Sequence, residues 1–156
     1  MTNVTVREAM ASDASAMSQI LRDILAVWKS DRPSSISHVI AHYVEHPERL
    51  SCSVAVDRSG AVLGFQSLKR AEEGNAYGLP AGWGISGTYV DAKAAGRGVG
   101  KALFASSLDA ARKADLKEID ATIGENNLSG LAYYDAIGFR TYRIKPGAIC
   151  KKYVVD

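Results

Sequence analysis

Hydrophobic and polar residues follow two different periods along the chain, and these periods divide it into helices and strands. Apolar residues at positions 17, 20, 21, 24, 25 and 28 form one stripe of a helix over residues 14–28. A second stripe, which includes Val99, Leu103, Phe104 and Leu108, predicts a helix over residues 99–114. Shorter helices are predicted at 36–45 and 128–137, and strands at 4–7, 51–57, 61–69, 83–91, 119–123, 139–144 and 149–155.

The order of these elements indicates the fold class. Strands and helices follow one another as β-α-α-β-β-β-α-β-α-β-β, which is typical of an α/β protein with a mixed sheet and helices on both of its faces. A turn at Asp57-Arg58-Ser59-Gly60 predicts a hairpin between the second and third strands. Residues 1–156 contain no repeat, low-complexity tract or linker, so we expect a single domain.

Composition and charge exclude several classes of protein. Apolar residues make up 47% of the chain and charged residues 23%, which is the balance of an ordinary globular domain. The isoelectric point near 8.5 lies below the range of a dedicated nucleic-acid-binding domain. The longest apolar run, from Ile24 to Trp28, is too short to cross a membrane, and the N-terminus lacks the apolar core of a signal peptide. We therefore expect a cytoplasmic protein that binds neither nucleic acid nor membranes.

The cysteine and histidine residues do not favour a metal centre. Cys52 and Cys150 are far apart in the sequence and form no CxxC motif, so buried thiols are expected rather than a disulfide or a nucleophile. His38, His42 and His46 recur every four residues, a spacing that can chelate a metal on one helical face. Because no carboxylate motif accompanies them, no metal is predicted.

A glycine-rich segment, residues 95–101, follows a predicted strand and opens the clearest helix. Glycines allow backbone N–H groups to converge on one point, and a helix N-terminus carries about half a positive charge there. Lys93, Arg97 and Lys101 add three cations. Neither the Rossmann nor the Walker pattern fits, because Lys101 or Leu103 stands where the last Rossmann glycine would be and Ala102 where the Walker Ser or Thr would be. A phosphate site and a plain tight turn both stay open at this point.

A second pattern lies downstream of the glycine segment. Asn127 ends a predicted strand, Tyr134 follows two helical turns later on the same face, and Gly138-Phe139 closes the helix. With the stretch from Thr88-Tyr89-Val90-Asp91 to Gly100, this pattern resembles the two signatures of the GNAT superfamily of N-acetyltransferases, and the element order is similar over the whole chain. The resemblance implies a mostly antiparallel central sheet of six to seven strands flanked by about four helices. In its length and its Tyr-Val-Asp strand, the chain most resembles the phosphinothricin or amino-acid N-acetyltransferase branch of the family.

The resemblance implies acetyl-CoA as the acetyl donor and cosubstrate. Backbone groups of the strand before the glycine segment would pair with the pantetheine arm, and the amides of residues 97–101 would hold the pyrophosphate. Asn127 would bond to the pantetheine or phosphate arm, and Tyr134 would lie beside the thioester sulfur. The residues expected to contact acetyl-CoA are Thr88, Tyr89, Val90, Gly96, Arg97, Gly98, Val99, Gly100, Lys101, Asn127 and Tyr134.

The chain departs from the family pattern at two places. Ala95 stands where the family usually has Arg or Gln, which puts the affinity for CoA in doubt. The phosphinothricin-like branch carries a glutamate shortly before the Tyr-Val-Asp strand, whereas residues 83–87 hold no carboxylate here. Candidate general bases are therefore Glu72, Glu73 and Glu125, and the alternative for each, which its loop position favours, is a solvated carboxylate.

Direct attack of an amine on the thioester needs no covalent intermediate. Tyr134, whose phenol titrates near 10, would act as general acid toward the departing thiolate; the alternative is a tyrosine that only packs in the core.

Arg32 would meet a substrate carboxylate, unless it is an ordinary surface arginine. The candidate substrate-binding residues are Trp28, Arg32, Tyr77 and Trp83, with core packing as the alternative for Trp28.

The sequence thus favours an N-acetyltransferase that acts on a primary amine of a small molecule, with an amino-acid-like acceptor preferred. Two alternatives stay open: a protein or peptide N-acetyltransferase of the same fold, and a catalytically silent CoA-binding sensor. Ala95 and the missing strand carboxylate give the sensor its support. A homodimer is compatible with the resemblance, because the final strands often mediate dimers in this family.

Overall fold

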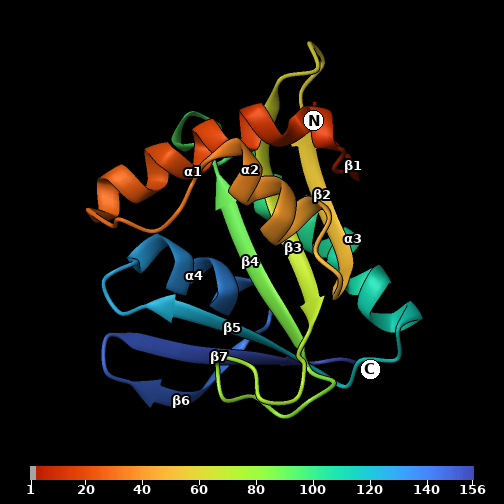
Figure 1. Cartoon of the computed structure of the whole chain (residues 1–156), viewed down its shortest axis with the longest axis vertical. Helices are drawn as coiled ribbons and strands as arrows, with labels where there is room; N and C mark the ends of the chain where they lie inside the picture. The colour runs from red at the N-terminus through yellow and green to blue at the C-terminus, as the bar shows by residue number, and fades with distance from the viewer. Residues whose placement is uncertain (1–2) are drawn as a thin grey trace.

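The computed structural model describes residues 3–156, which fold into one seven-stranded sheet with four α-helices (Figure 1). None of the helices in this range is long and apolar enough to cross a membrane. The strands are β1 (Thr5–Glu8), β2 (Arg49–Val56), β3 (Val62–Arg70), β4 (Gly84–Val90), β5 (Glu118–Gly124), β6 (Arg140–Lys145) and β7 (Ala148–Val154). The helices are α1 (Ala14–Trp28), α2 (Ile36–Val39), α3 (Val99–Lys113) and α4 (Leu128–Ala136), with short turns η1 (Ala11–Asp13), η2 (Ile40–Val44) and η3 (Ala92–Ala94).

The sheet is split between its two parallel strands. The strand order is β1-β2-β3-β4-β5-β7-β6, and every neighbouring pair is antiparallel except β4 and β5. These two pair only at Gly84 with Ile119 and at Ile85 with Asp120. Beyond these pairs they diverge toward their carboxyl ends (Figure 1). The predicted mixed, mostly antiparallel sheet is confirmed.

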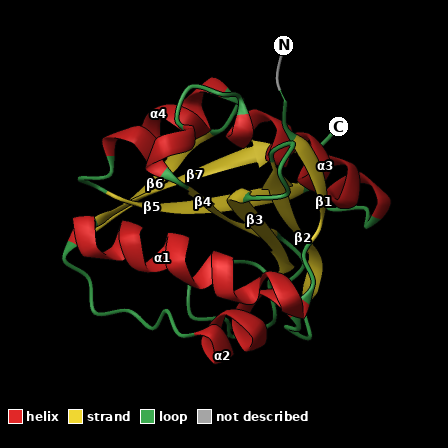
Figure 2. Cartoon of the chain, turned by 90° about the horizontal axis from the view of Figure 1, so that it is seen from above, coloured by secondary structure: helices red, strands yellow, loops and turns green. Residues whose placement is uncertain are grey.

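Helices cover both faces of the sheet (Figure 2). On one face lie α1 and α2, and the apolar stripe of α1 packs there with Tyr43, Phe65 and Tyr89. On the other face lie α3 and α4, where Phe104 and Phe139 pack with 5.5 Å between their ring centroids. Because successive strand residues point to opposite faces, each central strand sends alternate side chains into two separate cores.

The predicted bounds agree with the observed ones within two residues, except in the segment 36–45. That segment begins with a single α-helical turn, α2, whose N-cap is Ser35; its hydroxyl accepts a hydrogen bond from the His38 amide at 3.1 Å. It then continues as the wider π-helical turn η2, which buries Tyr43 and Val44. A hydrophobic stripe of ten residues does not distinguish the two kinds of turn, because both place the same few residues against the core.

Both cysteines are buried and free, as predicted. Burial raises the pKa of the Cys52 thiol to about 12. Since the thiolate is the reactive form of cysteine, Cys52 is inert at neutral pH.

Candidate active site

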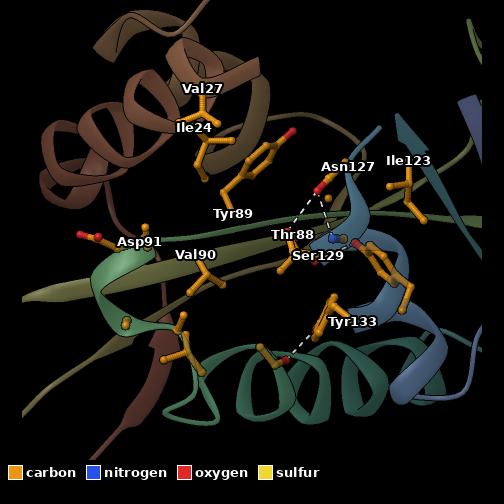
Figure 3. A pocket seen from close by; sticks show the side chains of 18 of the residues that line it. Ile24, Val27, Thr88, Tyr89, Val90, Asp91, Ile123, Asn127, Ser129 and Tyr133 are labelled. Carbon is orange, nitrogen blue, oxygen red and sulfur yellow. Dashed lines mark hydrogen bonds between the residues drawn. The ribbon is translucent and has the colours of Figure 1, made fainter. Parts of the chain in front are cut away.

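A cavity of about 690 Å³ lies where β4 and β5 diverge. Its lining comes from these two strands, from the C-terminal half of α1, from the segment between β4 and α3 with the first turn of α3, and from α4. In Figure 3, Ile24 and Val27 of α1 approach Tyr89 of β4 from one side, and Tyr133 of α4 points toward α3 on the other. The volume is typical of a small-molecule or cofactor site.

Strand β4 presents an unpaired edge to this cavity. From Ser86 to Val90 the strand pairs with β3 but not with β5. Thr88, Tyr89 and Val90 all line the cavity. An unpaired strand edge carries backbone N–H and C=O groups that an extended ligand can engage as if it were another strand.

The glycine segment forms an anion site at the N-terminus of α3. Gly96 and Gly98 have φ of +81° and +75°, a conformation that favours glycine, and Gly98 is the N-cap of the helix. The backbone amides of residues 98–101 have no acceptor among residues 3–156, and these residues line the cavity. Free amides and the positive end of the helix dipole together favour a phosphate group. Arg97 is exposed and lies outside the cavity lining, whereas Ala95, Gly96 and Lys101 belong to it.

Gly100 allows α3 and α4 to approach closely. The hydroxyl of Tyr133 donates a hydrogen bond to the Gly100 carbonyl at 2.7 Å. A Cβ at position 100 would lie 2.6 Å from the ring of Tyr133, so any other residue would push the two helices apart. The Tyr133 hydroxyl also accepts a hydrogen bond from Gln66 Nε2 at 2.9 Å, which ties α4 to β3. These contacts fix the glycine segment relative to the strands.

Tyr134 combines core packing with a hydroxyl at the cavity. Its ring packs 4.9 Å from Phe139, and its hydroxyl lies 2.7 Å from Thr88 Oγ1 and 3.2 Å from Ser86 Oγ. Burial raises the pKa of the Tyr134 phenol above its ordinary value. The phenol therefore keeps its proton at neutral pH, and its hydroxyl is a hydrogen-bond donor at the cavity.

Asn127 is the N-cap of α4 and lines the cavity. Its Oδ1 accepts hydrogen bonds from the Gly130 amide at 3.0 Å and from Ser129 Oγ at 3.2 Å. Asp91 caps η3 in the same way, since its Oδ1 accepts a hydrogen bond from the Lys93 amide at 2.9 Å. Both side chains thus hold the turns that lead into the cavity.

The end of the cavity near α1 holds a cation without an acidic partner. Trp28 and Arg32 line this end. Arg32 Nη2 donates a hydrogen bond to the Tyr89 hydroxyl at 3.1 Å, and the Tyr43 hydroxyl donates to the same oxygen at 3.4 Å. Within the described residues, Arg32 forms no ion pair with a carboxylate. This end can therefore take up an anionic group.

The other predicted substrate residues lie outside the cavity lining. Trp83 packs against Tyr142 with 5.6 Å between ring centroids, and the ammonium group of Lys152 lies 5.6 Å above the Trp83 ring. Tyr77 is in the loop between β3 and β4, where its carbonyl accepts a hydrogen bond from Arg143. The candidate bases are exposed and also lie outside the lining; they are Glu72, Glu73 and Glu125.

A comparison with known protein families identifies the family of this chain. The sequence model of the acetyltransferase (GNAT) family matches residues 15–139. The chain belongs to the GNAT acetyltransferase family. This makes it an acetyl-CoA-dependent N-acetyltransferase, as the two sequence signatures predicted. A search of curated proteins found no significant match.

Solved GNAT structures share the whole fold of this chain. A GCN5-related N-acetyltransferase from Kribbella flavida has a TM-score of 0.83 and 23% identity, and the alignment covers 97% of this chain and 98% of that one. The phosphinothricin acetyltransferase from Sinorhizobium meliloti, solved in complex with acetyl-CoA, has a TM-score of 0.78 and 21% identity over 98% and 89% of the two chains. An N-acetyltransferase from Staphylococcus aureus Mu50 has a TM-score of 0.78 and 20% identity over 99% and 100%. At these identities the likeness concerns the fold.

The GNAT cavity also contains polar residues that the sequence patterns did not single out. Ser86 and Thr122 line it from β4 and β5, and Asp120 is completely buried two residues before Thr122. The sequence pattern that could have indicated them is the alternation in β5, where Asp120 and Thr122 alternate with Ile119 and Ala121. The other face of β5 is apolar, so Asp120 points away from that apolar core. A buried carboxylate at this position is a candidate catalytic group.

The histidines of the segment 36–46 lie beside a lysine. His38 and His42 stack with 4.8 Å between centroids, and His42 Nε2 lies 3.2 Å from Lys69 Nζ. Burial and the Lys69 charge lower the pKa of His42 to about 4, and burial lowers the pKa of Lys69 to about 8. In the part of the GNAT chain that the structure describes, no group of three or more His, Cys, Asp or Glu could hold a metal ion.

Proposed function

We propose that this GNAT enzyme transfers the acetyl group of acetyl-CoA to the primary amine of a small, amino-acid-like acceptor. The acceptor class is inferred from the position and contacts of Arg32. It lines the cavity, donates to the Tyr89 hydroxyl, and has no carboxylate partner among residues 3–156. A guanidinium group binds a carboxylate through two parallel hydrogen bonds, so the carboxylate of an amino acid is the group we expect there.

The donor side of the cavity has the chemistry that a nucleotide thioester requires. The free amides of residues 98–101 fit a pyrophosphate, and the unpaired edge of β4 fits the amide groups of a pantetheine arm. When bound there, acetyl-CoA supplies an activated acetyl carbonyl. Ala95 leaves the backbone amides intact, so the loop can still bind phosphate without the usual Arg or Gln side chain.

Two groups of the chain would assist the transfer. An unpaired backbone N–H of β4, between Gly87 and Val90, would donate to the oxygen on which charge develops. Tyr134 would give its proton to the sulfur as the carbon–sulfur bond breaks, because burial keeps its phenol protonated. The hydrogen bonds that the Tyr134 hydroxyl shares with Thr88 and Ser86 orient it for this step.

The test is the release of free thiol from acetyl-CoA with the twenty standard L-amino acids and with the amines that their decarboxylation gives. We expect amino acids to be the better acceptors. Arg32→Gln should lower kcat/KM for amino acids by roughly 10- to 100-fold, the value of a charged hydrogen-bonding partner, and leave the decarboxylated amines unaffected. Arg22→Gln is the matched control, since Arg22 is an exposed arginine of α1 outside the cavity lining.

The outcomes separate the alternatives. Equal rates with amino acids and decarboxylated amines would refute the role of Arg32 and the acceptor class. Faster acetylation of peptide N-termini than of free amino acids would favour a peptide N-acetyltransferase. Binding of acetyl-CoA with no thiol release for any amine would favour the sensor. A homodimer and a cytoplasmic location stay predictions from the sequence.

A further inference from the structure

The interior of β5 contains a carboxylate, Asp120, that forms no direct ion pair among residues 3–156. Asp120 has no exposed surface. Its Oδ1 accepts a hydrogen bond from the Tyr142 hydroxyl at 2.6 Å, and its Oδ2 accepts one from Thr122 Oγ1 at 2.9 Å. Removing an unpaired carboxylate from water is costly, and carboxylates in such surroundings cluster at functional sites.

Asp120 lies at the point where the sheet opens. It pairs with Ile85 in the last rung that β4 and β5 share. Thr122, two residues further on and hence on the same face of β5, lines the cavity. The Thr122 hydroxyl therefore connects the buried carboxylate to the cavity in which the acceptor would bind.

We propose that Asp120 accepts the proton of the substrate ammonium group through the hydroxyl of Thr122. The proposal rests on the proposed function and names the base that it lacks. Thr122 Oγ1 takes a proton from the nitrogen while its own proton passes to Asp120 Oδ2. The neutral amine then forms the carbon–nitrogen bond, and the carbon–sulfur bond breaks with its electron pair on sulfur. The nitrogen loses its second proton to solvent, Tyr134 gives its proton to the thiolate, and the Tyr134 phenolate takes up a proton from solvent. Asp120 later releases its proton to solvent.

The surroundings of Asp120 favour its protonated form more than water does. Burial raises the pKa of Asp120 above its ordinary value, while the two hydrogen-bond donors and the charges of Arg143 and Lys145 oppose that shift. A base whose pKa is closer to the working pH takes up a proton more readily. The titratable groups around this carboxylate are Tyr77 of the loop before β4, Tyr142, Arg143 and Lys145 of β6, and Cys150 and Lys152 of β7.

The charges of the cavity also agree with an amino acid. Arg32 at the α1 end would hold the carboxylate, and Thr122 with Asp120 would receive the ammonium group from the β5 side. The two ends of a zwitterion would thus each meet a group of opposite charge. This arrangement orients the nitrogen toward the gap between β4 and β5.

The test compares the pH dependence of kcat/KM in the wild type and three variants, with the standard L-amino acid that releases thiol fastest and with hydroxylamine. Hydroxylamine is already unprotonated near neutral pH and needs no base. Asp120→Asn should lower kcat/KM for the amino acid by about 10²- to 10⁴-fold and remove the acidic limb of the profile, with a much smaller loss for hydroxylamine. Thr122→Val should behave alike, whereas Thr122→Ser should retain activity.

Tyr142→Phe gives a readout that a structural role would not produce. It removes one donor from the carboxylate, so the acidic limb should move to higher pH. Thermal melting and acetyl-CoA calorimetry identify variants that fail to fold. If Asp120→Asn fails to fold, the inference is tested by the shift of the acidic limb in Tyr142→Phe and by the activity of Thr122→Val. Unchanged activity of Asp120→Asn, or an equal loss with both acceptors, would overturn the inference alone. A wild type that binds acetyl-CoA but acetylates neither acceptor would overturn the proposed function and this inference with it.

Discussion

The substitution Gly98→Val tests whether the start of α3 binds the pyrophosphate. Gly98 has φ of +75° and lines the cavity. An L-residue pays roughly 1–2 kcal/mol in this left-handed conformation, and a β-branched one more. The loop should relax by rotating peptides, which turns some of the four free amides of residues 98–101 away from the ligand. A hydrogen bond to a charged group contributes about 1.5–3 kcal/mol, so the loss of one or two predicts roughly 10- to 10⁴-fold weaker binding.

The assay is calorimetric titration with acetyl-CoA, accompanied by denaturant unfolding. Gly60→Val is the matched control, because Gly60 has φ of +87°, a Cβ there meets no atom within 4 Å, and the residue lies outside the cavity lining. Both variants should lose similar free energy of unfolding, but only Gly98→Val should lose affinity. If both variants bound acetyl-CoA as the wild type does, the segment would be a turn and nothing more.

Two further predictions concern Tyr134 and Lys69. Tyr134→Phe should reduce kcat by about 10²- to 10⁴-fold and leave acetyl-CoA affinity nearly unchanged; equal turnover in a thiol-release assay would remove Tyr134 from the mechanism. Burial lowers the folded-state pKa of Lys69 from 10.5 to about 8, so the unfolded chain binds more protons between these values and the free energy of unfolding gains from this group as pH rises. The gain should be of the order of 2 kcal/mol after allowance for partial exposure. Denaturant melts of Lys69→Met across this range should lack it, and parallel curves for both proteins would contradict the assignment.

The sequence predicted best what depends on neighbouring residues. The helix α1 was predicted at its observed bounds because its apolar residues keep the helical period over all fifteen residues. The turn at the glycine segment could be predicted because it depends on neighbouring residues, and Gly96 and Gly98 adopt positive φ there. The same holds for the position of Asn127, whose cap forms within α4 itself.

What could not be predicted depends on contacts between distant segments. The period of the last strands does not reveal that β7 inserts between β5 and β6, because either strand could pair with β5. The surroundings of Trp83 follow from this insertion, since Tyr142 and Lys152 come from those strands. Asp120 was not among the candidate bases for the same reason, since its partner Tyr142 belongs to β6 and the sequence does not show that β6 lies near β5.

The alternation of one strand explains how the two halves of the reaction can meet. Thr88 and Tyr89 are consecutive in β4, so their side chains point to opposite faces of the sheet. The Thr88 hydroxyl bonds to Tyr134 on the face of α3 and α4, and the Tyr89 hydroxyl bonds to Arg32 on the face of α1. The group that would protonate the thiolate and the group that would anchor the acceptor are thus separated by the sheet. In a continuous sheet they could not act on one molecule; because β5 leaves β4 after Ile85, the nitrogen and the thioester can reach each other through the gap.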